Sequence, residues 1–413
     1  MRDWIYKQEI RSIHKICTTD IFRLYETGCS RVWYTHPLSK NPKKEEQPMK
    51  KIAYVGIDYH SNSLSIAVII EGQKKIHEMI RLKNEDKVIR KYMKKLSGDF
   101  EIKSCYEASC NGYAFQRKMA AWGYHCDVIA PSLIPKKAGN RRKNDFRDAR
   151  DLAQNYADGM LSVVHPPNEE EEAVRNLVRC RTSFKDDEKR IKYQINSLLL
   201  SQGLQWPKSK WTFAHRKWLK EIQLQSPYLQ QVLEEHLGHL HYIQSRITHL
   251  DGQIEEIARS EIYASSVKKL RAFKGIGTLS AMILISEITD FRRFASPRAL
   301  MAFLGLIPSE NSSGDKRVDG GITKAGNFRC RTQLIESVHH YVRSPHISLQ
   351  MKNDLSQVDA STANSAIKCL KRLHKRYWAL TMKGKIRPVV ITAIAREFIG
   401  FIWAVMQPQP LAA

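Results

Sequence analysis

The chain has 413 residues, which is enough for two or three domains. Hydrophobic residues make up 42% of it, a share that excludes a globally disordered protein. Lysine and arginine number 67 against 42 aspartate and glutamate, a formal net charge of +25, so we expect a polyanionic partner, nucleic acid first and an anionic membrane surface second. The eight cysteines include no CxxC pair, which argues against zinc and disulfide frameworks and favours a reduced, intracellular compartment.

The first 50 residues form an N-terminal extension that differs from the rest of the chain. Residues 1–30 are polar and charged and contain no apolar segment of a signal peptide. The stretch HPLSKNPKKEEQPMKK, which ends at Lys51, is typical of a charged linker. We therefore expect residues 1–50 to be poorly ordered, either as an upstream extension or as an over-called start before Met49.

Residues 51–162 alternate strand and helix patterns, which predicts an α/β domain. We expect strands at 53–58, 64–70, 75–82, 102–107 and 124–130, and helices at 86–97, 112–122 and 145–158. The first three strands are close enough in sequence to form antiparallel hairpins. The later strands need helical crossovers and can therefore be parallel. The prediction is a mixed sheet flanked by helices.

Residues 163–264 predict two long helices. The first, at about 168–200, begins with acidic residues that favour a helix N-terminus. The second, at about 228–262, has leucine and isoleucine in near-heptad spacing. The segment between them, GLQWPKSKWTFAHRKW, is rich in tryptophan and lysine. Two antiparallel helices joined in this way predict a coiled-coil arm that serves packing or oligomerisation, without chemistry of its own.

Residues 265–413 are predicted to form a mainly α-helical domain, with loops within 266–343 and two more helices within 360–406. The segment 388–406, PVVITAIAREFIGFIWAVM, is the strongest candidate for a membrane helix. Arg396 and Glu397 stand at its centre, where charge is costly in lipid. We therefore expect a buried helix of a soluble, cytoplasmic protein that has no membrane partner.

Four carboxylates lie where predicted elements of the sheet domain begin or end. Asp58 and Glu107 stand at predicted strand ends, whereas Asp145 and Asp148 share one face of a predicted helix start. If the four converge, their hard oxygens suit two Mg²⁺ or Mn²⁺ ions, which promote phosphoryl transfer. Each also has a simpler interpretation: a turn residue at Asp58, an exposed strand end at Glu107, a helix cap at Asp145, and for Asp148 a surface ion pair with an adjacent arginine.

A basic segment, KKAGNRRKNDFRDAR, runs into the predicted helix that carries Asp145 and Asp148. Such a loop suits contacts with a phosphate backbone, which are mainly electrostatic. It is equally typical of a solvated surface loop, because basic clusters alone are weak motifs. The candidate contact residues are Lys136, Lys137, Arg141, Arg142 and Lys143.

Two segments of the C-terminal half are further candidates. Gly275 and Gly277 form a GxG turn before a helix, as in helix-hairpin-helix motifs that grip a DNA phosphate, although a short GxG is weak evidence alone. Farther on, Ser312 and Ser313 precede a glycine in a polar loop, where a serine can be a nucleophile but is more often plain loop composition. No adjacent histidine activates either serine. Candidate nucleic-acid contacts in and after this loop are Lys316, Lys324 and Arg329.

Several motifs, in order, resemble a known family. They are YVGIDYH, YEASCNGYAFQRKMAAWGYHCDVIAPSLIPK, RKNDFRDARDLA, LRAFKGIGTLSAMILISEITDFRRFASPRALMAFLGLIPSENSSG and GGITKAGNFRCR. The chain resembles the DEDD-type transposases of the IS110 insertion-sequence family, RNA-guided recombinases related to the pilin-inversion recombinase. The resemblance covers about Lys51 to Met406. Asn144 and Thr323 are small departures, at positions where threonine and serine are frequent.

This resemblance implies a RuvC-like, ribonuclease-H-type fold for 51–162, a coiled-coil arm for 163–264 and a C-terminal transposase domain for 265–413. It also implies Mg²⁺, or Mn²⁺, as cofactor and a catalytic serine that forms a covalent link to DNA. Ser313, directly before Gly314, occupies the matching position, and Ser312 is its near neighbour. The implied metal ligands are Asp58, Glu107, Asp145 and Asp148.

The expected function is transposition of an insertion sequence in a bacterium or archaeon, close to the nucleoid. Its partners would be donor and target DNA, a structured non-coding guide RNA, and further copies of the chain in a dimer to tetramer, because the family assembles its active site from different subunits. One rival is a RuvC-like nuclease that hydrolyses DNA without a covalent intermediate, against which the serine loop argues. The other is a decayed, non-catalytic nucleic-acid-binding protein, against which the intact acid quartet argues.

Overall fold

The computed structural model describes residues 50–109, 111–135, 144–310 and 319–408, so the extension expected at 1–50 lies outside it except for Lys50. A six-stranded mixed sheet with the order β3-β2-β1-β4-β5-β6 begins this region. Its strands are β1 (Ile52–Tyr59), β2 (Ser63–Ile70), β3 (Ile76–Lys83), β4 (Glu101–Glu107), β5 (His125–Ile129) and β6 (Val163–Val164). The pairs β1–β4 and β4–β5 are parallel and the others antiparallel. The five predicted strands are confirmed to within one residue at each end, whereas β6 is too short to show a sequence period.

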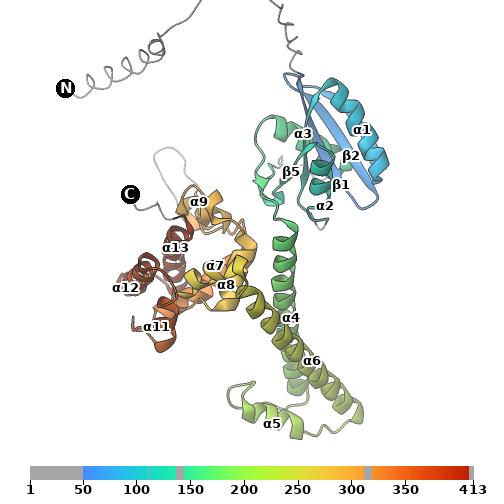
Figure 1. The fold of residues 1–413 in the computed structure, drawn as a ribbon. Helices are drawn as coiled ribbons and strands as arrows, with labels where there is room; N and C mark the ends of the chain where they lie inside the picture. The colour runs from blue at the N-terminus through green and yellow to red at the C-terminus, as the bar shows by residue number, and fades with distance from the viewer. Residues whose placement is uncertain (1–49, 110, 136–143, 311–318, 409–413) are drawn as a thin grey trace, which may run out of the picture. The chain divides into compact units, whose positions relative to one another are not determined.

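Helices cover both faces of this sheet (Figure 1). The helices α1 (Asp86–Asp99) and α2 (Ala114–Ala121) pack on the face that carries Val55 and Ile57. The helix α3 (Asp145–Ala157) packs on the opposite face. All three were predicted to within two residues, because their apolar residues recur at helical spacing. The mixed α/β sheet is consistent with a ribonuclease-H-like DEDD fold.

Gly56 allows α3 to approach β1 closely. A methyl group at this position would lie 2.2 Å from the backbone oxygen of Ala149 and 2.3 Å from the backbone nitrogen of Ala153, so a larger residue would displace the helix. Side chains alternate along a strand, so Asp58, two residues farther on, leaves the sheet on this same face. The first turn of α3, which precedes Ala149 by one turn, therefore lies near the end of β1.

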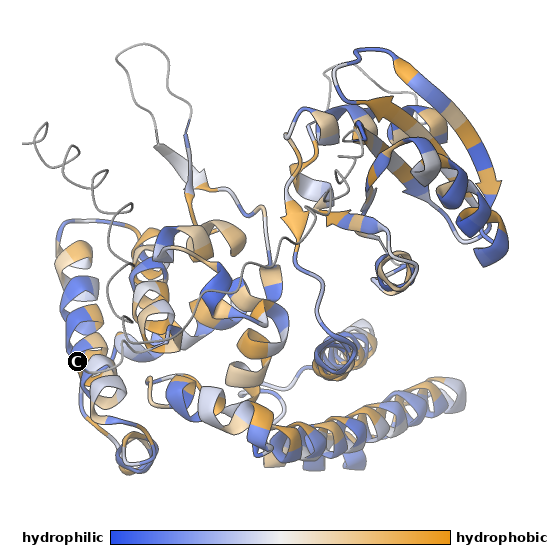
Figure 2. Cartoon of the chain, turned by 45° about the horizontal axis from the view of Figure 1, so that its top comes forward, coloured by the Kyte–Doolittle hydropathy of each residue, from blue (hydrophilic) through white to orange (hydrophobic). Residues whose placement is uncertain are grey.

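The next helices are α4 (Glu169–Ser201), α5 (Phe213–Glu221) and α6 (Pro227–Ala258). The two long ones, α4 and α6, share an apolar seam. Figure 2 shows hydrophilic residues interspersed with hydrophobic ones along α6, the long helix at the lower right. Arg181 donates to Asp251 at 2.7 Å, and Gln244 donates to Glu188 at 2.9 Å, so residue numbers rise along one helix as they fall along the other. The predicted antiparallel pair is therefore present, although α6 ends four residues early and α5 was not predicted.

The remaining helices surround one large apolar core. They are α7 (Glu261–Arg271), α8 (Thr278–Ile288), α9 (Pro297–Phe303), α10 (Phe328–Val338), α11 (Leu349–Leu355), α12 (Ala360–Met382) and α13 (Arg387–Met406), with a hairpin of β7 (Pro308–Glu310) and β8 (Asp319–Ile322). In the described part of the chain, only α13 is long and apolar enough to cross a membrane, a test that buried core helices also pass. Its Val390, Ile394, Phe398 and Ile402 lie in this core, as expected for a buried helix.

Candidate metal centre

Asp58 is the residue before last of β1, and its side chain is 19% exposed. It lies opposite Ser65 of β2, which in turn lies opposite Arg81 of β3. Residues paired in this way across a sheet have side chains on the same face. The three therefore form a row on the face covered by α3, at the end of the strand where the chain turns away.

Glu107 ends β4, the parallel neighbour of β1. Ile57 of β1 pairs with Tyr106 of β4, so the register places Glu107 beside Asp58 and on the same face of the sheet. Glu107 is exposed and forms no ion pair with the described residues. Two acids of the predicted quartet are thus brought to one sheet edge by the strand register alone.

The other two acids lie in the first turn of α3. Asn144 is its N-cap and accepts a hydrogen bond from the backbone nitrogen of Phe146 at 3.0 Å, so Asp145 does not cap this helix. The partial positive charge of the helix N-terminus favours carboxylates here. Arg150 pairs with Asp151 at 3.3 Å, which leaves Asp148 without that arginine as partner.

A histidine and an arginine complete the arrangement. The Nε2 atom of His60 lies 3.0 Å from Oδ2 of Asp58 and 3.9 Å from Oδ1 of Asp145. Arg81 donates from Nη2 to the other oxygen of Asp145, Oδ2, at 2.8 Å. The donor atoms of Asp58, His60 and Asp145 all lie within 4.8 Å of one another.

The electrostatics of Asp58 favour an added cation. Burial raises the pKa of its carboxyl, and the negative charges of Asp145 and Asp148 raise it further, while His60 opposes the shift. Acids that repel one another near a low-dielectric wall keep their charge only if a positive charge joins them. Carboxylate oxygens with one imidazole nitrogen are a donor set that divalent cations accept, so the residues fit a metal ion.

Comparisons with known proteins identify the family of this chain. A model described as the transposase IS116/IS110/IS902 family matches residues 267–351, and an IS110-type DEDD transposase model matches residues 55–202. The chain is 37% identical to "Putative transposase y4qE" of Sinorhizobium fredii, over 86% of this chain and 88% of that protein. It is 33% identical to the transposase for insertion sequence element IS1533 of Leptospira borgpetersenii, over 62% of this chain and 75% of the relative. This chain belongs to the IS110 family of transposases.

The DEDD domain of the transposase implies a divalent metal, and the matched segment contains all four acids. His60 and Arg81 were missed by sequence reasoning. His60 stands two residues after Asp58 in the motif YVGIDYH, and that proximity was an available signal. The role of Arg81 had no such signal, because it depends on the register of three strands.

Of the other predicted site residues of the transposase, some lie in the part of the chain that the structure describes and the rest lie outside it. Gly275 has a φ of +88°, and a methyl group there would lie 2.5 Å from the backbone oxygen of Ser337, so close packing against α10 accounts for this glycine. Gly277 is the N-cap residue of α8, and a methyl group there would meet no other atom within 4 Å. Lys324 is exposed, and the guanidinium of Arg329 lies 4.7 Å from the centre of the Phe328 ring. The positions outside the described residues are Lys136, Lys137, Arg141, Arg142, Lys143, Ser312, Ser313 and Lys316.

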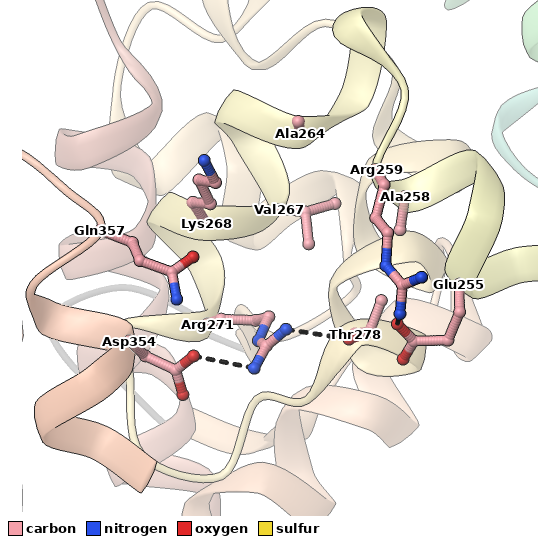
Figure 3. Close-up of a pocket in the computed structure, with 10 residues that line it drawn as sticks. All are labelled: Glu255, Ala258, Arg259, Ala264, Val267, Lys268, Arg271, Thr278, Asp354 and Gln357. Carbon is pink, nitrogen blue, oxygen red and sulfur yellow. Dashed lines mark hydrogen bonds and ion pairs between the residues drawn. The ribbon is translucent and has the colours of Figure 1, made fainter.

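A pocket of about 290 Å³ lies in the helical part of the transposase, between α6, α7 and α11 (Figure 3). Arg271 crosses it, pairing with Asp354 at 2.8 Å and donating to Thr278 at 3.4 Å. Most of the charged side chains that line the pocket are thus paired with one another. Neither Asp58 nor Asp145 lines this pocket, and we assign no chemistry to it.

Proposed function

We propose that this transposase moves its insertion sequence by cutting and rejoining DNA, and that Asp58, Glu107, Asp145 and Asp148 hold the divalent metal, Mg²⁺ or Mn²⁺. The convergence of Asp58 with the first turn of α3 carries the proposal. The strand register supports the proposal for Asp58 and Glu107, and the start of α3 supports it for Asp145 and Asp148. Of the four acids, Asp58 and Asp145 have donor atoms within 4.8 Å of one another. Divalent ions held there would neutralise the negative charge that develops on the phosphate in the transition state.

The nucleophile in this proposal is Ser313, which lies between β7 and β8 in the sequence, with Ser312 as the alternative. Its oxygen would form a bond to phosphorus while the phosphorus–oxygen bond to the leaving DNA strand breaks and that strand takes up a proton. A protein–DNA ester conserves the energy of the phosphodiester, so a strand can be joined to a new partner. Simple hydrolysis by a RuvC-like nuclease would need no serine.

The proposed nucleic-acid partners are inferred from the positive net charge of the chain. A net charge of +25 favours a polyanion, and we propose donor and target DNA together with a structured guide RNA. The basic contacts proposed are those of 136–143 and Lys316, Lys324 and Arg329, with backbone amides near Gly275 and Gly277. The antiparallel pair α4–α6 would serve as the family's coiled-coil arm in a dimer or tetramer that works at the nucleoid.

The test uses the full-length protein with guide RNA and labelled cognate DNA, followed by denaturation. Wild type should retain label on the protein, and Ser313→Ala should lose both label and recombination while still binding RNA. Loss of the adduct in Ser312→Ala alone would move the role to that serine. Cut DNA without any adduct from wild type would instead identify a hydrolytic nuclease.

A further inference from the structure

His60 sits in a turn that the fold holds in place. The turn joins β1 to β2, and the backbone nitrogen of His60 donates to the oxygen of Ser63 at 3.0 Å. Asn84, from the segment after β3, donates to the backbone oxygens of His60 at 3.1 Å and Ser61 at 3.0 Å. Asn111 donates to the backbone oxygen of Tyr59 at 3.0 Å. Three segments of the chain thus fix the backbone from which the imidazole projects.

The imidazole projects toward the two carboxylates. Its Nε2 atom is 3.0 Å from Asp58 and 3.9 Å from Asp145, which come from different elements of the fold. Bonds from a divalent transition metal to nitrogen and oxygen measure about 2.0–2.2 Å, so neighbouring ligand atoms around one ion lie roughly 3 Å apart. The contact of His60 with Asp58 matches this spacing, the contact with Asp145 is longer, and the donor atoms of all three residues lie within 4.8 Å of one another.

A second observation points to the same place. The hydroxyl of Ser65 is fully buried and has no hydrogen-bond partner among the described residues. Ser65 lies opposite Asp58, with its side chain on the same face of the sheet. A buried hydroxyl without a partner costs free energy, and the water shell of an ion beside Asp58 would supply one.

We propose that His60 is a metal ligand, so that this centre is a mixed nitrogen–oxygen site that binds Mn²⁺ in preference to Mg²⁺. The inference rests on the proposed function, because it takes the acid quartet as the metal centre. Carboxylates alone suit Mg²⁺, whereas an imidazole nitrogen favours transition metals. His60 would bind through Nε2 as neutral imidazole, with its proton on Nδ1.

The chain offers a matched control. His125 of β5 forms a similar pair, with Nε2 at 3.2 Å from Oδ2 of Asp127. The third group there is the hydroxyl of Tyr156, which donates to Asp127 at 2.6 Å, in place of a second carboxylate. This pair has the histidine and one acid but lacks the further acid that an ion would need, so His125 should not bind the metal.

The experiment is pulsed electron paramagnetic resonance of Mn²⁺ bound to the full-length protein, which detects coupling of the ion to a ligand nitrogen. Wild type and His125→Ala should show a nitrogen-14 coupling, and His60→Ala should lose it. Titration should show that His60→Ala weakens Mn²⁺ binding by at least about 10-fold, with a smaller change for Mg²⁺. The wild-type spectrum decides ligation even if the variant folds poorly, and His60→Gln provides a second, polar replacement.

Three results would overturn the inference, and they are distinguishable from one another. Mn²⁺ that binds wild type but not Asp58→Ala, without nitrogen coupling, would leave the acid quartet as the metal centre and remove His60 from it. A coupling that persists in His60→Ala would also remove His60. Mn²⁺ binding that is unchanged in Asp58→Ala would reject the metal centre itself, and with it the proposed function.

Discussion

Asp58 in the sheet domain and Glu287 in the helical domain are both acids removed from water, yet their surroundings are opposite. Burial raises the pKa of Glu287, but hydrogen bonds from Arg179 outweigh it and leave the pKa lowered. Arg179 donates through two nitrogens at 2.7 Å each, and Asn327 donates at 2.7 Å. Asp58 instead faces two further acids, and the pKa of its carboxyl is raised.

The difference separates an acid that stabilises the fold from an acid that we propose as a metal ligand. Glu287, with a side chain that is 1% exposed, has its charge fully matched by the protein and joins α4 to α8. A buried charge of this kind is costly to leave unpaired, so its partners are part of the structure. Asp58 has His60 as its partner, which carries a positive charge only when protonated, and Arg81 pairs with the neighbouring Asp145. An added cation would balance the remaining negative charge.

The largest effect should follow from Asp58→Ala, which removes an acid from the proposed centre. Recombination should fall by about 10³-fold or more, because metal ions contribute several kcal/mol to phosphoryl transfer. The melting temperature without metal should not fall, since a repulsive carboxylate is removed. Strand-exchange assays and thermal melts measure both. If the variant recombines at the wild-type rate in Mg²⁺ or Mn²⁺, Asp58 is not part of the metal centre and does not differ from Glu287 in the proposed way.

The second-largest effect is expected for Glu287→Ala, which should change stability and leave metal binding unchanged. It should destabilise the helical domain by about 3–5 kcal/mol, because Arg179 would be left partly buried without its partner. Mn²⁺ binding should not change. Denaturant unfolding measures the loss, and Glu255→Ala is the control, an exposed helix acid that lies 3.8 Å from Arg259 and whose loss should cost about 0–1 kcal/mol. Equal losses for the two variants would contradict the structural role of Glu287.

Arg81→Ala should have an intermediate effect on the metal centre. Arg81 holds Oδ2 of Asp145 and leaves Oδ1 facing His60, so it orients the carboxylate without contacting the ion. Losing such a partner typically lowers metal affinity by about 10–100-fold. Isothermal titration with Mn²⁺ measures this, and Arg81→Lys should restore part of it. Lys83, two residues farther along β3 and on the same face, is the control, and an equal loss in Lys83→Ala would indicate a general charge effect.

The parts of this site that were predictable are local ones. The strand that carries Asp58 and the helix that starts at Asp145 each have a sequence period and a nearby boundary signal, and the sequence predicts the ends of the strand and the start of the helix to within one residue. The roles of His60 and Arg81 depend on which strands are neighbours and on their register, which a single sequence does not encode locally. The strand β6 could not be predicted either, because its two residues are too few to show a period.

The catalytic serine stays a prediction for a related reason. Ser313 was assigned from a motif resemblance, and it lies outside the described residues, as does Ser312. No local pattern determines whether a loop of one domain reaches the acids of another, within one chain or between subunits. The proposed acid quartet differs in this respect, because its four members lie on one sheet and one helix of the described structure.

The smallest expected effect is a pH-dependent change in the melting temperature of Asp58→Asn. The folded-state pKa of Asp58 is raised, so the folded protein binds a proton more tightly than the unfolded chain does. Its contribution to stability is therefore lost as pH rises from the unfolded-state value, about 3.9, through the higher folded-state value. Asparagine cannot ionise and escapes this loss.

In a chelating buffer, Asp58→Asn should melt roughly 1–3 °C above wild type at about pH 7.5, and the gap should close at about pH 4. Saturating Mn²⁺ should reverse the order, because an ion that binds only the folded wild type stabilises it by mass action. Thermal melts at the two pH values, with and without Mn²⁺, test both signs. A variant that is less stable than wild type in the chelating buffer at about pH 7.5 would mean that His60 already compensates the charge of Asp58. The site would then resemble the matched acid at Glu287.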